Sequence, residues 1–276
     1  GFQAESGKGE LQNMPLRQKI ALAEIVSHDK KLKEIAKWAG RFTQIARTKQ
    51  KMKYKRSTEQ SGVETGDDLE RLLPSELVQY VNPKTKKEFL RKLSEKETLQ
   101  FEQKGKESLG RGSIILCLDQ SGSMRNLETQ SKGFALALMA IAKKQKRNFA
   151  YIPFDDGVHK VQQFPKGKIK PNEIIAMAKE FSGGGTSFYQ PLEKAISVIN
   201  KDRFNNADII FITDGEAHVS KSFIEKFNKK KEEKNFHLLS LVIGHRANER
   251  TVTHFSDRVV KIRDFNDEGS FTAFEI

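Results

Sequence analysis

The stretch SIILCLDQSGSM (113–124) joins a continuous apolar run to a cluster of small polar side chains. An apolar run of this length is typical of a strand that is buried on both faces. Directly after it, Asp119, Ser121 and Ser123 occupy every second position, with Gly122 between the two serines. Such a cluster fits three kinds of structure: a turn with a helix cap, a nucleophile site, or half of a metal site.

Similar apolar runs recur along the C-terminal part of the chain, at 148–154, 207–213, 236–244 and 258–262. Helical patterns alternate with them, at 131–147, 172–181, 190–200 and 220–234. This alternation predicts an α/β fold with a doubly wound, mostly parallel sheet that is covered by helices on both faces. The stretch VHKVQQF (158–164) adds a predicted short antiparallel edge strand.

The first 112 residues contain no convincing strand, so we expect an all-α N-terminal region (1–110) before the α/β domain (111–276). Apolar residues at helical spacing between 32 and 46 predict an amphipathic helix, with Gly40 inside it. The charged stretch 86–107 predicts a further helix. In SGVETGDDLERLLPSEL (61–77) the first part is expected to be a polar loop, and Ser75 to cap a helix.

Two more loops of the predicted sheet carry oxygen ligands. Asp214 follows the run IIFIT, and Thr186 follows three glycines in FSGGGTSF (181–188). Ligands of an open parallel sheet collect outside the carboxyl ends of its strands, so the loops are expected to converge with Asp119, Ser121 and Ser123. Carboxylates and alcohols suit Mg²⁺, with Mn²⁺ as the alternative ion. Because few of these ligands are charged, the ion would keep positive charge for a carboxylate of another protein.

Composition bears on the expected partners and on the cellular compartment. The 276 residues carry a formal charge of +13, which indicates acidic partners or a strongly solvated surface. The single cysteine, Cys117, lies in an apolar run, so we expect a core thiol and a reducing cytoplasm. No apolar run is long enough to span a bilayer, and the first ten residues do not form a signal peptide. The first residue is not Met, which indicates a fragment of a longer chain.

The basic stretch RFTQIARTKQKMKYKR (41–56) holds seven basic residues, no acidic one and few aromatic ones. A solvated helix face, or contact with an acidic protein surface or anionic lipid headgroups, is favoured over nucleic-acid binding. An RNA-binding module that uses this stretch stays open as a further alternative.

Enzymatic alternatives are weaker but stay open. The glycines before Thr186 lack the G-K-[ST] ending of a P-loop, and DQSGS differs from the G-x-S-x-G of a nucleophile elbow. The histidines are scattered; His218, four residues past Asp214, is expected at the surface. Asp155 and Asp156 are expected to form a turn that could add negative charge near the ion. A metal-dependent phosphatase or other hydrolase on the same ion remains the enzymatic alternative.

The combination of DQSGS, GGT and TDG resembles the metal-ion-dependent adhesion site of von Willebrand factor type A domains, over about residues 110–270. The order and spacing of the three elements agree with that family. The resemblance implies that the metal site consists of Asp119, Ser121, Ser123, Thr186 and Asp214.

The stretches AGRFTQIA, GDDLERLLPSEL and LALMAIAKKQKRNFAYIPF further resemble the bacterial CoxE-like and ViaA-like proteins. In that group a helical region precedes a von Willebrand A domain, and members act with MoxR-type AAA+ ATPases in assembly or remodelling of other complexes. The resemblance thus implies a non-enzymatic, metal-dependent adaptor. Its expected partners are such an ATPase and a client protein that offers an acidic side chain.

Overall fold

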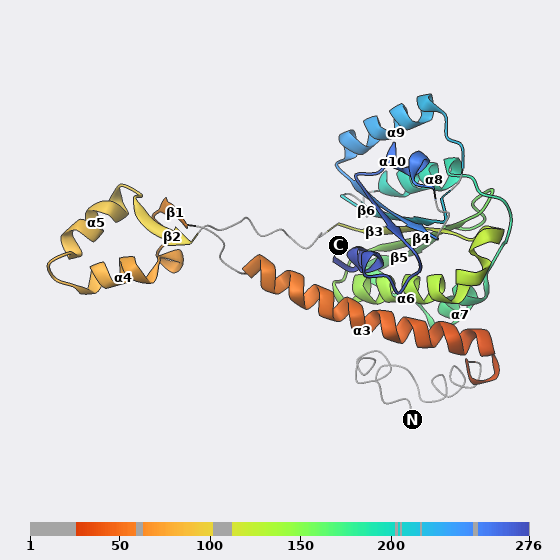
Figure 1. The fold of residues 1–276 in the computed structure, drawn as a ribbon, viewed down its shortest axis with the longest axis horizontal. Coiled ribbons are helices and arrows are strands. Elements are labelled where there is room, and N and C mark those ends of the chain that lie inside the picture. Colours follow the sequence, from red (N-terminus) through yellow and green to blue (C-terminus); the bar gives the residue numbers. More distant parts are fainter. Residues whose placement is uncertain are drawn as a thin grey trace. The chain divides into compact units, whose positions relative to one another are not determined.

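A six-stranded sheet organises the larger part of the chain (Figure 1). The computed structural model describes residues 26–58, 63–101, 112–201, 204, 206–215, 217–244 and 248–275. Its side chains are described over the same ranges except at 52–58 and 70. Within the described residues, no helix is both long enough and apolar enough to cross a bilayer.

The strands of this sheet lie in the order β5-β4-β3-β6-β7-β8, and all neighbouring pairs are parallel except β4 with β5. They are β3 (Ile114–Asp119), β4 (Phe149–Phe154), β5 (Gln162–Phe164), β6 (Asp208–Thr213), β7 (His237–Ile243) and β8 (Arg258–Ile262). The predicted doubly wound, mostly parallel sheet with a short antiparallel edge strand is confirmed.

Helices cover both faces of the sheet, because the strands are apolar on both sides (Figure 1). Among the described residues, the α-helices that begin before residue 50 or after residue 111 are α3 (Lys30–Thr58), α6 (Glu128–Lys144), α7 (Pro171–Lys179), α8 (Tyr189–Ile199), α9 (Lys221–Lys234) and α10 (Arg250–Thr253). Short 3₁₀ helices are η2 (Gly122–Leu127), η3 (Pro165–Gly167) and η5 (Glu268–Glu275).

Successive residues of β3 enter opposite cores. Leu116 joins the cluster beneath α3, α6 and η5, and Cys117 joins the cluster beneath α8, α9 and α10. Cys117 is fully buried, as the sequence predicts, and burial raises the pKa of its thiol. Helices therefore cover both faces of the sheet. The polar side chain of β3, that of Asp119, lies at the end of the strand.

The first half of α3 packs directly on α6. Phe42 is fully buried against Phe134, with ring centroids 5.5 Å apart. Gly133 allows this approach, since a Cβ atom there would lie 2.5 Å from Cβ of Trp38. Described residues before 50 thus form one unit with those after 111, whereas the sequence-based boundary lies at residue 110.

Residues 50–110 form a second unit, which contains β1 (Val63–Gly66), η1 (Leu69–Arg71), α4 (Pro74–Val81), α5 (Lys86–Ser94) and β2 (Thr98–Phe101). Strands β1 and β2 pair in antiparallel fashion. Helices are present here as predicted, but the expectation of no strand before residue 112 is wrong. The loop predicted before Asp67 contains β1, and the helix predicted over 86–107 ends at Ser94.

Helix α4 also begins differently from the prediction. Ser75 does not cap it, because the helix starts at Pro74 and Leu73 occupies the cap position. Proline is well suited to the first helical position, where its missing N–H would have no partner in any case.

Candidate functional site

The loop after β3 places two hydroxyls beside a buried carboxylate. Asp119 is the last residue of β3, and its Oδ1 accepts a hydrogen bond from the backbone N–H of Ser121 at 2.8 Å. The Oγ atoms of Ser121 and Ser123 lie 3.0 Å apart. Asp119 and Ser121 are buried whereas Ser123 is exposed, so the hydroxyl pair reaches from the interior to the surface.

The end of β6 supplies the second part of the site. Thr213 donates its hydroxyl hydrogen to Oδ2 of Asp119 at 2.6 Å, and its own Oγ1 accepts from the N–H of Gly215 at 3.1 Å. Strands β3 and β6 are neighbours at the point where the strand order reverses, which is where ligands collect in such sheets.

The carboxyl group of Asp119 has an unusually high pKa for an aspartate. Burial raises its pKa to about 6, and the negative charge of the nearby Asp214 acts in the same direction. The hydrogen bonds from Thr213 and Ser121 act in the opposite direction. Asp214 itself is half-buried directly after β6. The negative charges of Asp119 and Asp214 therefore repel each other at the ends of two neighbouring strands.

The glycine-rich loop 181–188 is bound to the loop after β3 by two backbone hydrogen bonds. Gly183 N–H donates to Gln120 O, and Gly122 N–H donates to Gly184 O, each at 2.9 Å. A Cβ at Gly122 would lie 3.3 Å from Gly183 O, so the two backbones are in close contact. Thr186, which is half-buried, lies two residues beyond this contact.

The spacing of the two serine hydroxyls is compatible with a small divalent cation. Octahedral Mg²⁺ binds oxygen at about 2.0–2.1 Å, which places neighbouring ligands roughly 2.9 Å apart. The separation of the Ser121 and Ser123 Oγ atoms, 3.0 Å, matches that spacing. Oδ1 of Asp119 accepts from Ser121 N–H and Oδ2 accepts from the Thr213 hydroxyl, and a carboxylate oxygen has two lone pairs.

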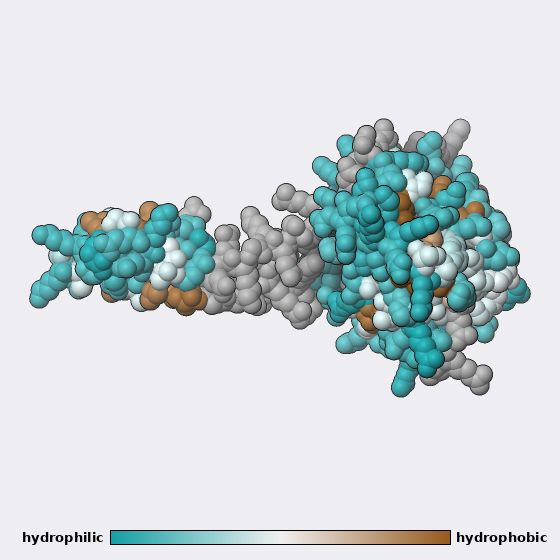
Figure 2. Space-filling view, turned by 90° about the horizontal axis from the view of Figure 1, so that it is seen from above, coloured by the Kyte–Doolittle hydropathy of each residue, from teal (hydrophilic) through white to brown (hydrophobic). Residues whose placement is uncertain are grey.

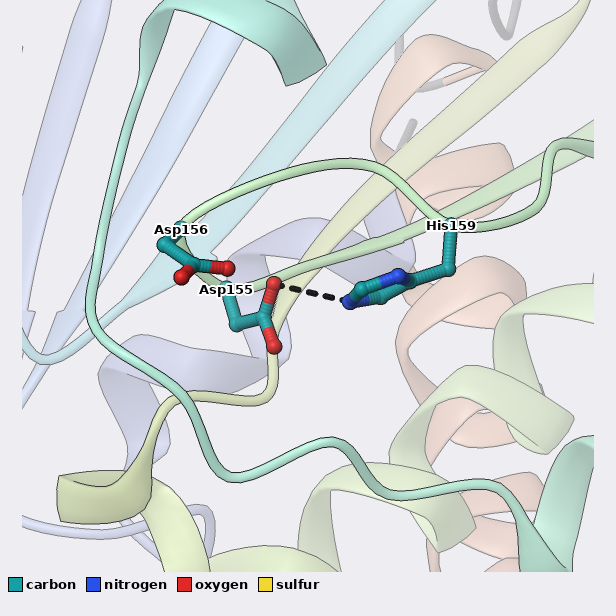
Figure 3. A group of neighbouring side chains, drawn as sticks. All are labelled: Asp155, Asp156 and His159. Atoms are coloured by element: carbon teal, nitrogen blue, oxygen red, sulfur yellow. Dashed lines mark hydrogen bonds and ion pairs between the residues drawn. The ribbon is translucent and has the colours of Figure 1, made fainter.

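A third group of polar side chains follows β4. Asp155, Asp156 and His159 offer ligand atoms that all lie within 4.8 Å of one another (Figure 3). Oδ1 of Asp155 accepts from Gly157 N–H and lies 3.0 Å from Nε2 of His159. The predicted turn at Asp155 and Asp156 is confirmed, since both residues lie between β4 and β5.

This turn lies against the glycine-rich loop. A Cβ at Gly184 would lie 2.8 Å from Oδ2 of Asp155, and the Asp155 carbonyl accepts from Ser187 N–H at 2.7 Å. Burial opposes ionisation of Asp155, but hydrogen bonds from Gly157 N–H and from the Ser182 and His159 side chains outweigh it and lower its pKa to about 2. Asp155 therefore places a full negative charge beside the loop that carries Thr186.

A fully buried lysine lies behind the site. Lys132 Nζ donates to the carbonyls of Met177 at 2.8 Å and Glu180 at 2.6 Å, and lies 3.2 Å from the Tyr151 hydroxyl. Gln120 Nε2 donates to the same hydroxyl at 2.7 Å. Lys132 thus connects the start of the glycine-rich loop to the loop after β3. Burial lowers the pKa of Lys132 to about 7, although the negative charges of Glu128 and Glu180 act to raise it.

Sequence reasoning named the loops but missed three side chains that organise them: Thr213, Asp155 in its anchoring role, and Lys132. Thr213 directly precedes Asp214, and that position was the only clue to it. Lys132 lies in SKGFALALM, where no pattern distinguishes a buried lysine from an exposed one. His218 is exposed, as the sequence predicts.

The basic stretch 41–56 lies within α3, which runs from residue 30 to residue 58. Phe42 and Ala46 of this stretch are buried in the core. Arg41 stacks on Trp38, with its Cζ atom 5.4 Å from the ring centroid. One face of the helix in this part of the stretch therefore packs into the core beneath α6 and η5.

Comparison with known proteins agrees with this geometry. Residues 114–216 match the family model described as von Willebrand factor type A domain. Two uncharacterized proteins of Methanocaldococcus jannaschii are similar along nearly the whole chain. One is 37% identical over 95% of this chain and 60% of its own length, and the other is 33% identical over 98% and 69%.

The regulatory protein ViaA of Proteus mirabilis is 28% identical over 66% of this chain and 41% of its own length. The chain thus spans about two fifths to two thirds of the length of these relatives.

Solved structures of low sequence identity are similar to part of the chain. The von Willebrand factor type A protein from Catenulispora acidiphila is 17% identical over 59% of this chain and 41% of its own, with a TM-score of 0.46. Proximal thread matrix protein 1 from the mussel byssus, with a zinc-occupied MIDAS motif, is 17% identical over 58% and 45%, with a TM-score of 0.41. Both scores are below 0.5, so these likenesses add nothing to the case for a function.

The family model matches residues 114–216, and one relative is 33% identical over 98% of this chain and 69% of its own length. The chain belongs to the von Willebrand factor type A domain proteins, among relatives that include the regulatory protein ViaA.

Proposed function

We propose that this protein is a metal-dependent adaptor that binds a client protein through a Mg²⁺ ion at the carboxyl edge of its sheet. The proposed ligands are Ser121, Ser123 and Thr186, with Asp119 and Asp214 binding the ion directly or through water. Mn²⁺ is the alternative ion. The observation that carries the proposal is the Ser121–Ser123 hydroxyl pair, 3.0 Å apart beside a carboxylate whose two oxygens are both oriented by hydrogen bonds.

The donor set explains why the ion would bind a partner. Alcohol ligands are neutral, so an ion held mainly by them keeps positive charge. A carboxylate from a client protein would then complete the coordination. Asp119 is oriented for this task from both sides, by Ser121 N–H and by the Thr213 hydroxyl.

We further propose that the adaptor works with a MoxR-type AAA+ ATPase in assembly or remodelling of client complexes, in the cytoplasm and without catalysis of its own. The support is similarity: ViaA is among the relatives, and the N-terminal stretches of this chain resemble the ViaA-like group. The ATPase contact is therefore a separate claim from the metal site and is tested separately.

Calorimetric titration of the full chain with MgCl₂ tests the metal site. Thr186→Val should reduce Mg²⁺ affinity at least about tenfold, the size expected from loss of one ligand bond of roughly 1.4 kcal/mol. Ser187→Ala is the matched control, because it removes a neighbouring hydroxyl that is not a proposed ligand. Equal affinity in wild type and Thr186→Val would refute the ligand set.

A pull-down with a purified MoxR-type ATPase and its client, in MgCl₂ and in EDTA, tests the adaptor role. Client capture should require Mg²⁺ and should fail in the double variant Asp119→Ala, Ser121→Ala. Capture that is equally strong in EDTA would contradict the mechanism. Sustained Mg²⁺-dependent turnover of phosphoesters, abolished by Asp119→Asn, would establish the hydrolase alternative instead.

A further inference from the structure

Exposed apolar side chains gather in the second unit, residues 50–110. Figure 2 shows apolar patches on this smaller body. All of the large apolar residues found exposed in the described part of the chain lie there: Val63, Leu69, Leu77, Val78, Tyr80, Val81, Leu90 and Leu99. Large exposed apolar patches are uncommon on a protein without partners.

Helix α4 is the clearest case, because its polarity is reversed. Its acidic residue Glu76 is 1% exposed, whereas Leu77, Val78 and Val81 are 47%, 66% and 77% exposed. Spacings of three and four residues place these apolar side chains on one stripe of the helix, which we call the α4 stripe (Leu77, Val78 and Val81). A helix that faced only water would present the opposite pattern.

The buried side of α4 is energetically unfavourable by itself. Oε2 of Glu76 is buried and has no hydrogen-bond partner among the described residues, and Oε1 lies 3.9 Å from Nζ of Lys92. Burial of a poorly paired carboxylate has a free-energy cost, and so does exposure of three aliphatic side chains. A partner on the α4 stripe would cover the three aliphatic side chains and so remove the cost of their exposure.

Contacts with α5 fix the orientation of the helix. The rings of Tyr80 and Phe89 lie 5.4 Å apart, and Phe89 is buried. Thr85 donates its hydroxyl hydrogen to the carbonyl of Gln79 at 2.9 Å. Because the stripe is held in place before any partner arrives, binding would cost little conformational entropy.

Positive charge borders the stripe at its C-terminal end. Lys84, Lys86 and Lys87 are exposed, and no acidic residue occurs between 77 and 87. Nζ of Lys86 lies 4.9 Å above the ring of Tyr80, next to the stripe. A second copy of α4 would offer these lysines no carboxylate, since its only acid is buried. The charges favour a partner that is apolar in the centre and acidic at the edge.

We infer that the α4 stripe is a docking surface for an amphipathic helix of another protein that carries acidic residues beside its apolar face. The surface uses none of the proposed metal ligands, so this contact does not depend on the ion. It would give an adaptor a second, metal-independent contact, and it stands whether or not the metal site functions as proposed.

Two synthetic helical peptides test the inference by fluorescence anisotropy with the full chain in EDTA. Both carry leucines at i, i+3, i+4 and i+7, flanked by glutamates in one and by lysines in the other. The glutamate peptide should bind at least about tenfold more tightly than the lysine peptide. The triple variant Lys84→Glu, Lys86→Glu, Lys87→Glu should reverse that preference.

The double variant Val78→Asp, Val81→Asp should abolish peptide binding without a change in melting temperature, because both side chains are exposed. Val63→Asp is the matched control: it replaces an exposed valine outside α4 and should leave binding intact.

Several outcomes would overturn the inference. They are failure of both peptides to bind at millimolar concentration, equal binding of both, and a lower melting temperature of the double variant, which would indicate that this chain itself covers the stripe. A wild-type dimer that the double variant dissociates in sedimentation would assign the stripe to a second copy. If the wild type binds phosphatidylglycerol vesicles, the double variant does not, and neither peptide binds, the stripe would be assigned to a membrane.

Discussion

Thr213 donates a 2.6 Å hydrogen bond to Asp119 and thereby joins the ends of two strands that are 94 residues apart in the chain. Thr213 is fully buried, and the carboxylate that it contacts is almost so. The bond therefore contributes both to the stability of the sheet edge and to the orientation of Asp119.

Thr213→Val should lower the free energy of unfolding by about 1–3 kcal/mol, because it leaves a buried carboxylate oxygen without its donor. Mg²⁺ affinity should fall in parallel, since Asp119 loses one of the two bonds that orient it. Urea unfolding and calorimetric Mg²⁺ titration measure the two effects. Thr213→Ser keeps the hydroxyl and should preserve affinity; equal loss in both variants would mean that the hydrogen bond is not the cause.

Two adjacent glycines of the 181–188 loop should respond differently to alanine. In Gly184→Ala the new Cβ meets Oδ2 of Asp155 at 2.8 Å, and that side chain is buried and hydrogen-bonded. We expect a loss of about 1–3 kcal/mol in the free energy of unfolding. In Gly185→Ala the nearest atom is 3.7 Å away, so stability should change by less than about 0.5 kcal/mol. Similar effects at both positions would contradict the close packing.

Two helical glycines provide a second comparison. Gly40 has open space around it, so Gly40→Ala should stabilise the protein by about 0.5–1 kcal/mol through helix propensity. Gly133→Ala should destabilise it, because the new Cβ would lie 2.5 Å from Cβ of Trp38 and 2.9 Å from the backbone N of Ala39. Thermal unfolding of both variants tests the packing of α3 on α6. A stabilised Gly133→Ala variant would show that α3 does not pack there.

Lys132 should make stability depend on pH. Its pKa is lowered to about 7 in the folded protein, chiefly by burial, and is ordinary in the unfolded chain. Between pH 7 and about 10 only the unfolded chain binds this proton, so raising the pH favours folding by up to about 1.4 kcal/mol per pH unit. Below pH 7 both states are protonated and the contribution is lost.

Comparison with Lys132→Met isolates this effect. The wild type should gain free energy of unfolding relative to the variant as the pH rises from 7 to 9.5 in urea denaturation. A constant difference across that range would mean that Lys132 stays charged inside the protein, with its ammonium bound to the carbonyls of Met177 and Glu180.

The α/β part of the fold could be predicted because its strands are apolar on both faces. In β3 and β6 nearly every residue is buried, so the sequence shows continuous apolar runs that periodicity detects. The polar residues that end these runs, Asp119 and Asp214, locate the site for the same reason.

The 50–110 region could not be predicted in the same way. Strand β2 is only four residues long, TLQF, and follows a charged helix without a break in composition. Its conformation depends on pairing with β1 and with Leu72, which lie about thirty residues away. The same holds for Lys132 and Thr213, whose partners are set by packing between distant segments rather than by local pattern.

The bond between the ends of β3 and β6 has a consequence for synthesis of the protein. The ribosome makes Asp119 long before Thr213, so a growing chain holds the aspartate without the hydroxyl that orients it. A product that stops before residue 213 lacks Thr213 and also β7 and β8, so the carboxyl edge of its sheet is incomplete. Unfinished or clipped molecules would therefore be poor competitors for whatever the finished edge of the sheet binds.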